Sequence, residues 1–186
     1  NERASLAFHK GIVSIDGYYS LTHGKLFHTN DKTGIHTLDN GEKHDIDTRM
    51  VTRGDGRPEH DYRIAADLDF AKNHQLSISY SGNYKKKGQH IEMTGMQTSL
   101  MDNSIKDILH NVHLDYTLPI GLNLGADFTY YEDNVRQDMA SALQGERLSF
   151  ITTSQQRINR SKFFAREEHM LGKKARVNYG MVYTHI

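Results

Sequence analysis

The stretch that decides the fold is DYRIAADLDFAKNHQLSISYSGNY, residues 61–84. From Tyr62 to Phe70 every second residue is apolar, and charged or small residues stand between them. After a short polar break, apolar and aromatic residues alternate with serine and asparagine from Leu76 to Tyr84. Alternation with a period of two residues predicts two β-strands, each with one apolar and one polar face.

The same pattern recurs in three other parts of the chain. Each predicted hairpin has a short turn: KG at 10–11, AKNHQ at 71–75, the segment Pro119–Gly121, and a turn near Gly172. The sequence therefore predicts an all-β chain, an antiparallel up-and-down meander of about eight strands. Its hairpins are expected near 3–29, 61–84, 107–131 and 160–186.

Long polar segments separate these hairpins and show no comparable alternation. They are expected to be loops near 30–60, 85–106 and 132–159, with a short helix over 137–148 as an option inside the last one. A compact soluble β-sandwich rarely has such long loops at one end only. Outer-membrane barrels do, because their periplasmic turns are short and their extracellular loops long.

Composition limits the classes of protein that fit. The 186 residues have 23 basic and 23 acidic side chains, so a net charge of +0 predicts no nucleic-acid partner. The chain has no cysteine, which excludes disulfides and thiolate metal sites. Mean hydropathy is −0.69 and no long apolar run predicts a transmembrane helix. A transmembrane β-barrel stays compatible, because its signal in each strand is far weaker.

The two faces of the predicted strands lead to two groups of residues. In a barrel the polar face lines the lumen and the apolar face contacts lipid. The lumen-facing candidates are Asp67, Asp69, Asn111, His113, Asp115, Asn123 and Asp127. The lipid-facing candidates are Tyr62, Ile64, Leu68, Phe70, Leu76, Ile78, Tyr80, Val112, Leu114, Tyr116, Leu122, Leu124, Phe128 and Tyr130.

The phase of the strands predicts part of a larger barrel, without a plug domain. A complete barrel of this kind begins and ends on the periplasmic side, so its first connection is a long loop. Here the first connection is the KG turn at 10–11, and both chain ends fall on the long-loop side. Open sheet edges would favour self-association. Two alternatives stay open: a complete small outer-membrane barrel with a structural or adhesion role, and a soluble β-sandwich that serves as a binding module.

Three segments resemble a known family. The hairpin at 61–84 is similar to the signature hairpin of the outer-membrane β-barrel family of Bacteroidetes, which is related to TonB-dependent receptors. KGIVSIDGYYSLTHGK (10–25) resembles its preceding hairpin, and GKKARVNYGMVYTHI (172–186) a later strand. In the last segment, Met181 and Val182 replace the usual pair of an apolar residue and arginine.

The resemblance implies a large outer-membrane barrel of a Gram-negative cell, for the binding or uptake of an unidentified ligand. It implies as partners the remaining strands and plug of the full-length barrel, TonB acting through that plug, and lipid or lipopolysaccharide. It does not imply a particular ligand.

No catalytic or metal-binding motif was found, so a non-enzymatic protein without cofactor is expected. His110 and His113 are three residues apart, which places them on opposite faces of a strand. Asp67 and Asp69 share a face and could serve calcium or acid–base chemistry, but lumen solvation is the favoured interpretation. The lysine run YKKKGQ (84–89) is expected to be a solvated rim or a contact with lipopolysaccharide.

Overall fold

The computed structural model describes residues 1–95, 98–143, 146–171 and 175–186, and these form one antiparallel sheet of ten strands. The strands are β1 (Glu2–Lys10), β2 (Val13–Thr22), β3 (Phe27–Thr37), β4 (Lys43–Gly54), β5 (Glu59–Ala71), β6 (His74–Gly95), β7 (Thr98–Thr117), β8 (Leu122–Leu143), β9 (Glu146–Leu171) and β10 (Ala175–His185). No helix in the described part of the chain is long and apolar enough to cross a membrane.

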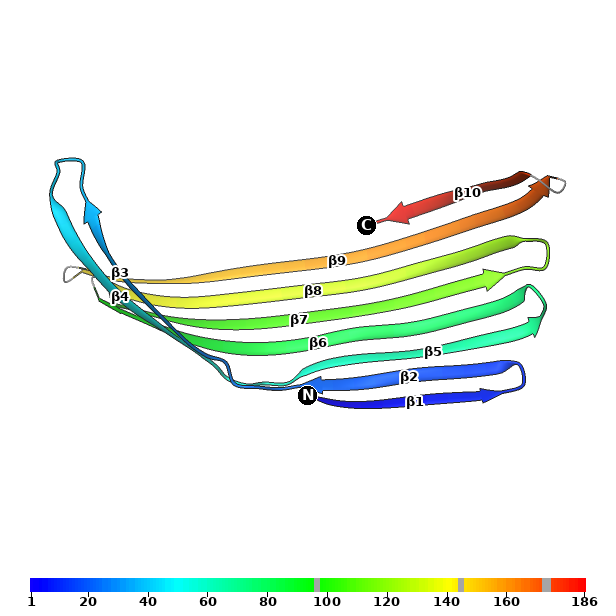
Figure 1. Ribbon diagram of the computed structural model, residues 1–186, viewed down its shortest axis with the longest axis horizontal. Coiled ribbons are helices and arrows are strands. Elements are labelled where there is room, and N and C mark those ends of the chain that lie inside the picture. Colours follow the sequence, from blue (N-terminus) through cyan, green and yellow to red (C-terminus); the bar gives the residue numbers. More distant parts are fainter. Residues whose placement is uncertain (96–97, 144–145, 172–174) are drawn as a thin grey trace.

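The main path through the sheet is β1-β2-β5-β6-β7-β8-β9-β10, with β3 paired to β4 and β4 paired to β6 (Figure 1). The strand count is ten, not about eight, because the β3–β4 hairpin was not predicted. β1 and β10 lie at the two ends of this path, so the described residues leave the sheet open.

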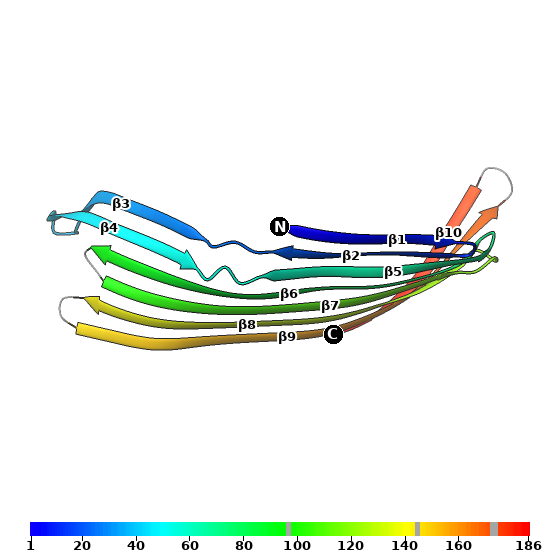
Figure 2. The same ribbon diagram turned by 90° about the horizontal axis from the view of Figure 1, so that it is seen from below.

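The sheet is a single curved layer (Figures 1 and 2). Among the described residues, Ala65 is the only hydrophobic residue that is buried, at 6% exposed. Large apolar side chains in the middle of the sheet stay open, such as Ile64 at 55% and Phe128 at 43%. A β-sandwich needs two sheets packed face to face. The structure therefore does not support the soluble sandwich.

Short turns connect the strands at one end of the sheet (right in Figure 1). Gly11, Asn73 and Gly121 have positive φ angles of 62°, 58° and 86° there. Glycine and asparagine tolerate this left-handed conformation, which tight turns require. The turn expected near Gly172 lies outside the described residues.

The expectation of long loops is wrong. Residues 85–106 mostly belong to β6 and β7, and residues 132–159 mostly belong to β8 and β9. Segment 30–60 is mostly the β3–β4 hairpin and the start of β5. The optional helix over 137–148 is also wrong, since β8 and β9 occupy its described residues. These strand halves escape a search for alternation because polar residues stand on both of their faces, with only scattered apolar residues such as Ile91 and Met93 among them.

The cross-strand register places the apolar residues on one face. Ile78 of β6 lies opposite Ala66 of β5 and Leu114 of β7, and this row of partners continues across the sheet. Its members are Phe8, Ile15, Ala66, Ile78, Leu114, Ala126, Phe163 and Tyr183. We call this side the apolar face, and the rows from Leu76 to Tyr84 the apolar band. The opposite side is the polar face.

The β3–β4 hairpin leaves the main sheet at a break in both of its arms. Residues 23–26 separate β2 from β3, and residues 55–58 separate β4 from β5. The break keeps two backbone hydrogen bonds, Gly54 N to Leu26 O at 2.7 Å and Asp55 N to Gly88 O at 3.0 Å. β6 thus pairs first with β5 and then with β4 along the same edge.

Amide hydrogen exchange will show whether the segments beyond the apolar band, on the side remote from the short turns, are strands or loops. We expect slow exchange for the amides of residues 87–93 and 99–105 in the full chain held in detergent micelles, because these residues pair in the β6–β7 ladder. The short turn at 72–73 supplies the fast-exchanging control. Uniformly fast exchange over 87–93 would restore the loop interpretation.

Candidate functional site

Aromatic side chains gather on the apolar face at the end of the band remote from the short turns. Tyr62 Oη lies 3.2 Å from His110 Nδ1, and Tyr80 Oη lies 2.8 Å from the same nitrogen. Tyr19 Oη lies 2.6 Å from His60 Nδ1. We call these residues, with Tyr84 and Tyr130, the aromatic belt. Amphipathic rings of this kind are typical of a boundary between apolar and aqueous surroundings.

Gly82 makes room for the belt. A Cβ atom added there would lie 2.5 Å from Tyr62 Oη, so the tyrosine ring lies over the glycine. A glycine beneath an aromatic ring from the next strand is a recurrent device of β-sheets. The absence of a side chain at this position therefore keeps Tyr62 within reach of His110.

All the lipid-facing candidates except Phe70, which falls in the register shift between Asp69 and Ala71, share the parity of Ile78 and so lie on the apolar face. Phe70 and His74 meet near the short turns, with ring centroids 5.0 Å apart, and His74 Nε2 lies 2.7 Å from Tyr116 Oη. Leu122 belongs to the same end of the band. That this face contacts lipid stays a prediction.

The lumen-facing candidates share the polar face, and several of them meet there. His113 Nδ1 donates a hydrogen bond of 2.5 Å to Asp127, whose other carboxylate oxygen lies 3.5 Å from Lys162 Nζ. Asn123 donates to Asp115, and also to Thr117 at 3.1 Å. Cross-strand pairs of this kind stabilise a sheet that has no core.

Other candidates stand apart from this cluster. The Thr129 hydroxyl donates to Asn111 at 2.8 Å, and the Ser77 hydroxyl donates to Asp67 at 2.5 Å. Asp69 pairs with Gln75 next to a register shift, and its amide donates to Ile12 O. Asp67 and Asp69 therefore have different surroundings. Among the described residues, no three His, Asp or Glu side chains are placed to hold a metal ion.

The sequence reasoning missed the cationic side of the cluster. Lys162 and Arg166 of β9 approach the ring of Phe164, at 5.2 Å and 6.0 Å from its centroid. Phe164 also stacks on His113, with centroids 6.5 Å apart. These three β9 residues alternate along the strand, which was a usable signal. Glu167 and Glu168, which follow Arg166 directly, interrupt the alternation in the first arm of the hairpin predicted near 160–186.

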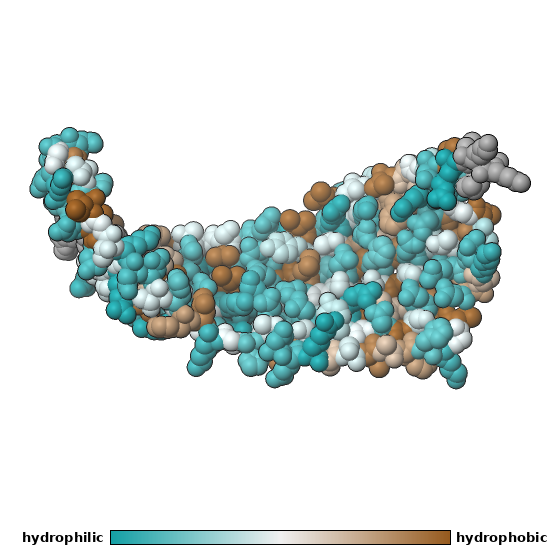
Figure 3. All heavy atoms as spheres, viewed as in Figure 1, coloured by the Kyte–Doolittle hydropathy of each residue, from teal (hydrophilic) through white to brown (hydrophobic). Residues whose placement is uncertain are grey.

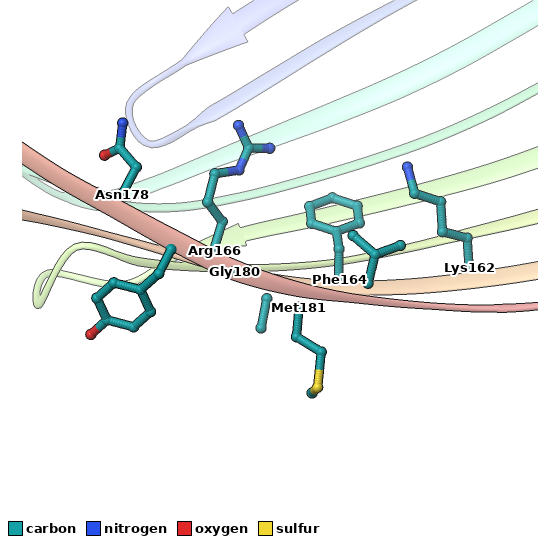
Figure 4. Close-up of a pocket in the computed structure, with 9 residues that line it drawn as sticks. Lys162, Phe164, Arg166, Asn178, Gly180 and Met181 are labelled. Carbon is teal, nitrogen blue, oxygen red and sulfur yellow. The ribbon is translucent and has the colours of Figure 1, made fainter.

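A hollow of about 430 Å³ lies where β9 meets the edge strand β10. Figure 4 shows Lys162, Phe164, Arg166 and Asn178 on one side of the strands and Met181 on the other. The lining side chains thus belong to both faces of the sheet. The hollow is a groove along an open edge and not an enclosed ligand site.

Beyond the band, the polar face becomes richer in apolar side chains. Four of the seven methionines follow neighbouring strands there: Met50 lies opposite Met93, and Met101 lies opposite Met139. Phe150, which is 50% exposed, is the β9 partner of Met139. Methionine is flexible and polarizable and suits surfaces that accept varied ligands. In the view of Figure 3, hydrophilic side chains cover most of the visible face, with apolar residues scattered among them.

A charged cluster lies beyond the band on the side continuous with the apolar face. Arg53 donates a hydrogen bond of 2.8 Å to Glu92, and His90 Nδ1 lies 2.6 Å from Asp102. The hydrogen bond to Asp102, aided by Glu92, raises the pKa of His90. The hydrogen bond from Arg53, aided by His90, lowers the pKa of Glu92. Such charges need an aqueous environment, which places this part of the sheet outside any lipid.

Comparison with solved structures identifies a similar fold. The ferric yersiniabactin uptake receptor FyuA from Yersinia pestis matches with a TM-score of 0.55 and 11% sequence identity. The match covers 96% of this chain and 26% of the receptor, so the chain spans about a quarter of its length. No family model and no curated protein matches the sequence. The ten-stranded antiparallel sheet resembles the barrel of a TonB-dependent receptor.

The His90 cluster predicts a defined pH dependence. The raised pKa of His90 means that its stabilising contribution is complete below the ordinary histidine pKa and is lost as pH rises through the raised value. We expect Asp102→Asn to lower the pKa of His90, measured by NMR titration of the imidazole in the micelle-bound full chain. His36, on the distant β3–β4 hairpin, is the control. An unchanged His90 titration would contradict the assigned pairing.

Proposed function

We propose that this chain is a membrane-embedded segment of an outer-membrane receptor of the TonB-dependent type, from a member of the Bacteroidetes. The receptor binds a ligand at the cell surface, and its uptake of that ligand depends on a plug domain and on TonB. The role is non-enzymatic. The remaining strands and the plug belong to the full-length protein, of which this chain supplies a part.

One observation carries the proposal: a contiguous apolar face with no second layer to cover it. The nine positions from Leu76 to Tyr84 span about 26 Å along the strand, the length that a tilted transmembrane β-strand requires. The aromatic belt borders the band on one side, and His74 and Tyr116 border it on the other. A lipid bilayer has the thickness and the polarity to cover this surface.

The polar face supports contact with a ligand. Its inner part presents the cluster of Asp127, Lys162 and Phe164, and its outer part presents the methionines. Asn103 Oδ1 and Asn123 Oδ1 are shielded and have no hydrogen-bond partner among the described residues. A donor group on a ligand would satisfy these acceptors. A ligand with both polar donors and apolar surface fits this face best.

Adjacent residues of β8 provide a matched test of membrane contact. Since the chain has no cysteine, Leu124→Cys and Asn123→Cys can each carry a single fluorescent label. We expect brominated lipids to quench the label at position 124 strongly and at position 123 weakly, because the two side chains face opposite sides of the sheet. Equal quenching at both positions, or none at 124, would contradict the proposed orientation.

The size of the native gene product tests the receptor assignment. We expect an antibody against this chain to detect a heat-modifiable band in the outer-membrane fraction, several times larger than 21.3 kDa. The band should shift on boiling, because closed barrels resist detergent until heated. A membrane band at 21.3 kDa would instead favour the small barrel with a structural or adhesion role.

A further inference from the structure

Three rows of side chains lie at the outer end of the apolar band: its last row, which contains Tyr84, and the next two rows, which contain Lys86 and Gly88. On the face continuous with the band, these rows carry four basic side chains, Lys86, Lys106, Arg136 and Arg157. At these rows, the acidic side chains on this face are Glu132 and Asp55, whose carboxylate lies over Gly88 and pairs with Arg57 at 2.6 Å. Glu92, Asp102 and Asp138 lie farther out, and Asp138 pairs with Arg136 at 3.2 Å. A cationic layer therefore lies directly against the aromatic belt.

The sheet divides the lysine run 85–87 between two environments. Lys85 and Lys87 point to the polar face, where Lys85 lies 3.1 Å from Asp107 and Lys87 lies 2.9 Å from Glu59. Lys86 points to the opposite side and is exposed. It makes no ion pair with the residues that the structure describes. In this run, Lys86 is thus, among the described residues, an unpaired cation on the face continuous with the apolar band, and its two neighbours are cations on the polar face that are neutralised by carboxylates.

Lys86 has a like charge as its direct neighbour. Its cross-strand partner is Lys106, and like charges directly opposite each other destabilise a strand pair. Lys106 is partly neutralised by Glu132 at 3.6 Å, but Glu132 also lies 3.5 Å from Arg157 and is only 8% exposed. One carboxylate serves two cations, and Lys86 receives none of this compensation. An external anion between the two lysines would relieve the repulsion.

We propose that Lys86 and Lys106, supported by Arg157, form a binding site for the phosphate group of an outer-leaflet glycolipid. This inference rests on the membrane role proposed above. Phosphate fits because lysine binds it as a point charge, and because both side chains point away from the polar face. A membrane lipid fits because its head group lies at the height where the acyl region ends. The aromatic belt and the cationic rows mark that height on the sheet.

The test uses the full-length native protein in detergent micelles, with bound lipid measured by native mass spectrometry. The probes are lipid A carrying two phosphates and an acyl-matched lipid A from which both are removed. We expect the wild type to prefer the phosphorylated lipid. Lys86→Gln with Lys106→Gln should weaken that binding on the order of 30-fold, from about 1 kcal/mol for each lysine near an anionic lipid surface.

The same run supplies a matched control, Lys85→Gln with Lys87→Gln, which removes equal charge from the polar face. This control should keep the preference, and Lys86→Arg with Lys106→Arg should keep it too. An equal loss in the control pair, or none in the outward pair, would overturn the site. Displacement of the lipid by millimolar inorganic phosphate would also overturn it, because the site would then bind free phosphate.

Failure of the membrane role can be told from failure of the phosphate site. If the wild type binds neither lipid and brominated lipids do not quench the label at position 124, the membrane role and this inference fall together. If the wild type binds both lipids equally well while the label is quenched, the phosphate site alone is wrong.

Discussion

The backbone ladder between neighbouring strands is the constraint on which the rest of this structure depends. The described residues form a single layer in which Ala65 is the one buried hydrophobic residue, so they contain no packed core that holds the strands together. Each central strand instead satisfies its amide and carbonyl groups through its two neighbours, and side chains add cross-strand pairs on both faces. The central strands are thus satisfied in their backbone hydrogen bonds, but the apolar face of the sheet still needs an apolar environment.

One ladder runs through two environments without interruption. Between Leu76 and Tyr84, β6 has an apolar and a polar face. From Lys85 to Gly95 both faces carry polar groups, yet pairing with β7 continues through Met93. The regions beside the band are therefore held by the same rigid strands that carry the band. This continuity fixes the height of the aromatic belt, the cationic rows and the methionine-rich surface relative to one another.

Sequence periodicity located the strand pairs at 61–84 and 107–131 and separated their faces, because one side of each strand is apolar. It could not find the strand halves beyond Tyr84 and Tyr130, where apolar residues such as Ile91 and Met139 are scattered among polar ones and the alternation of the band ends. The β3–β4 hairpin escaped notice for the same reason. The cross-strand partners, such as Lys162 beside Asp127 or Lys106 beside Lys86, depend on register. Register joins residues distant in the chain and leaves no local pattern.

The pleat that separates Lys85, Lys86 and Lys87 has a consequence for how such a chain tolerates changes of length. Inserting one residue within the band would turn every later side chain of β6 to the other face, which would move Lys86 inward and its neutralised neighbours outward. Inserting two residues would preserve the faces and shift only the height. Among relatives of this sequence, gaps inside the band should therefore occur in even numbers, whereas hairpin tips such as that between β3 and β4 are free of this rule.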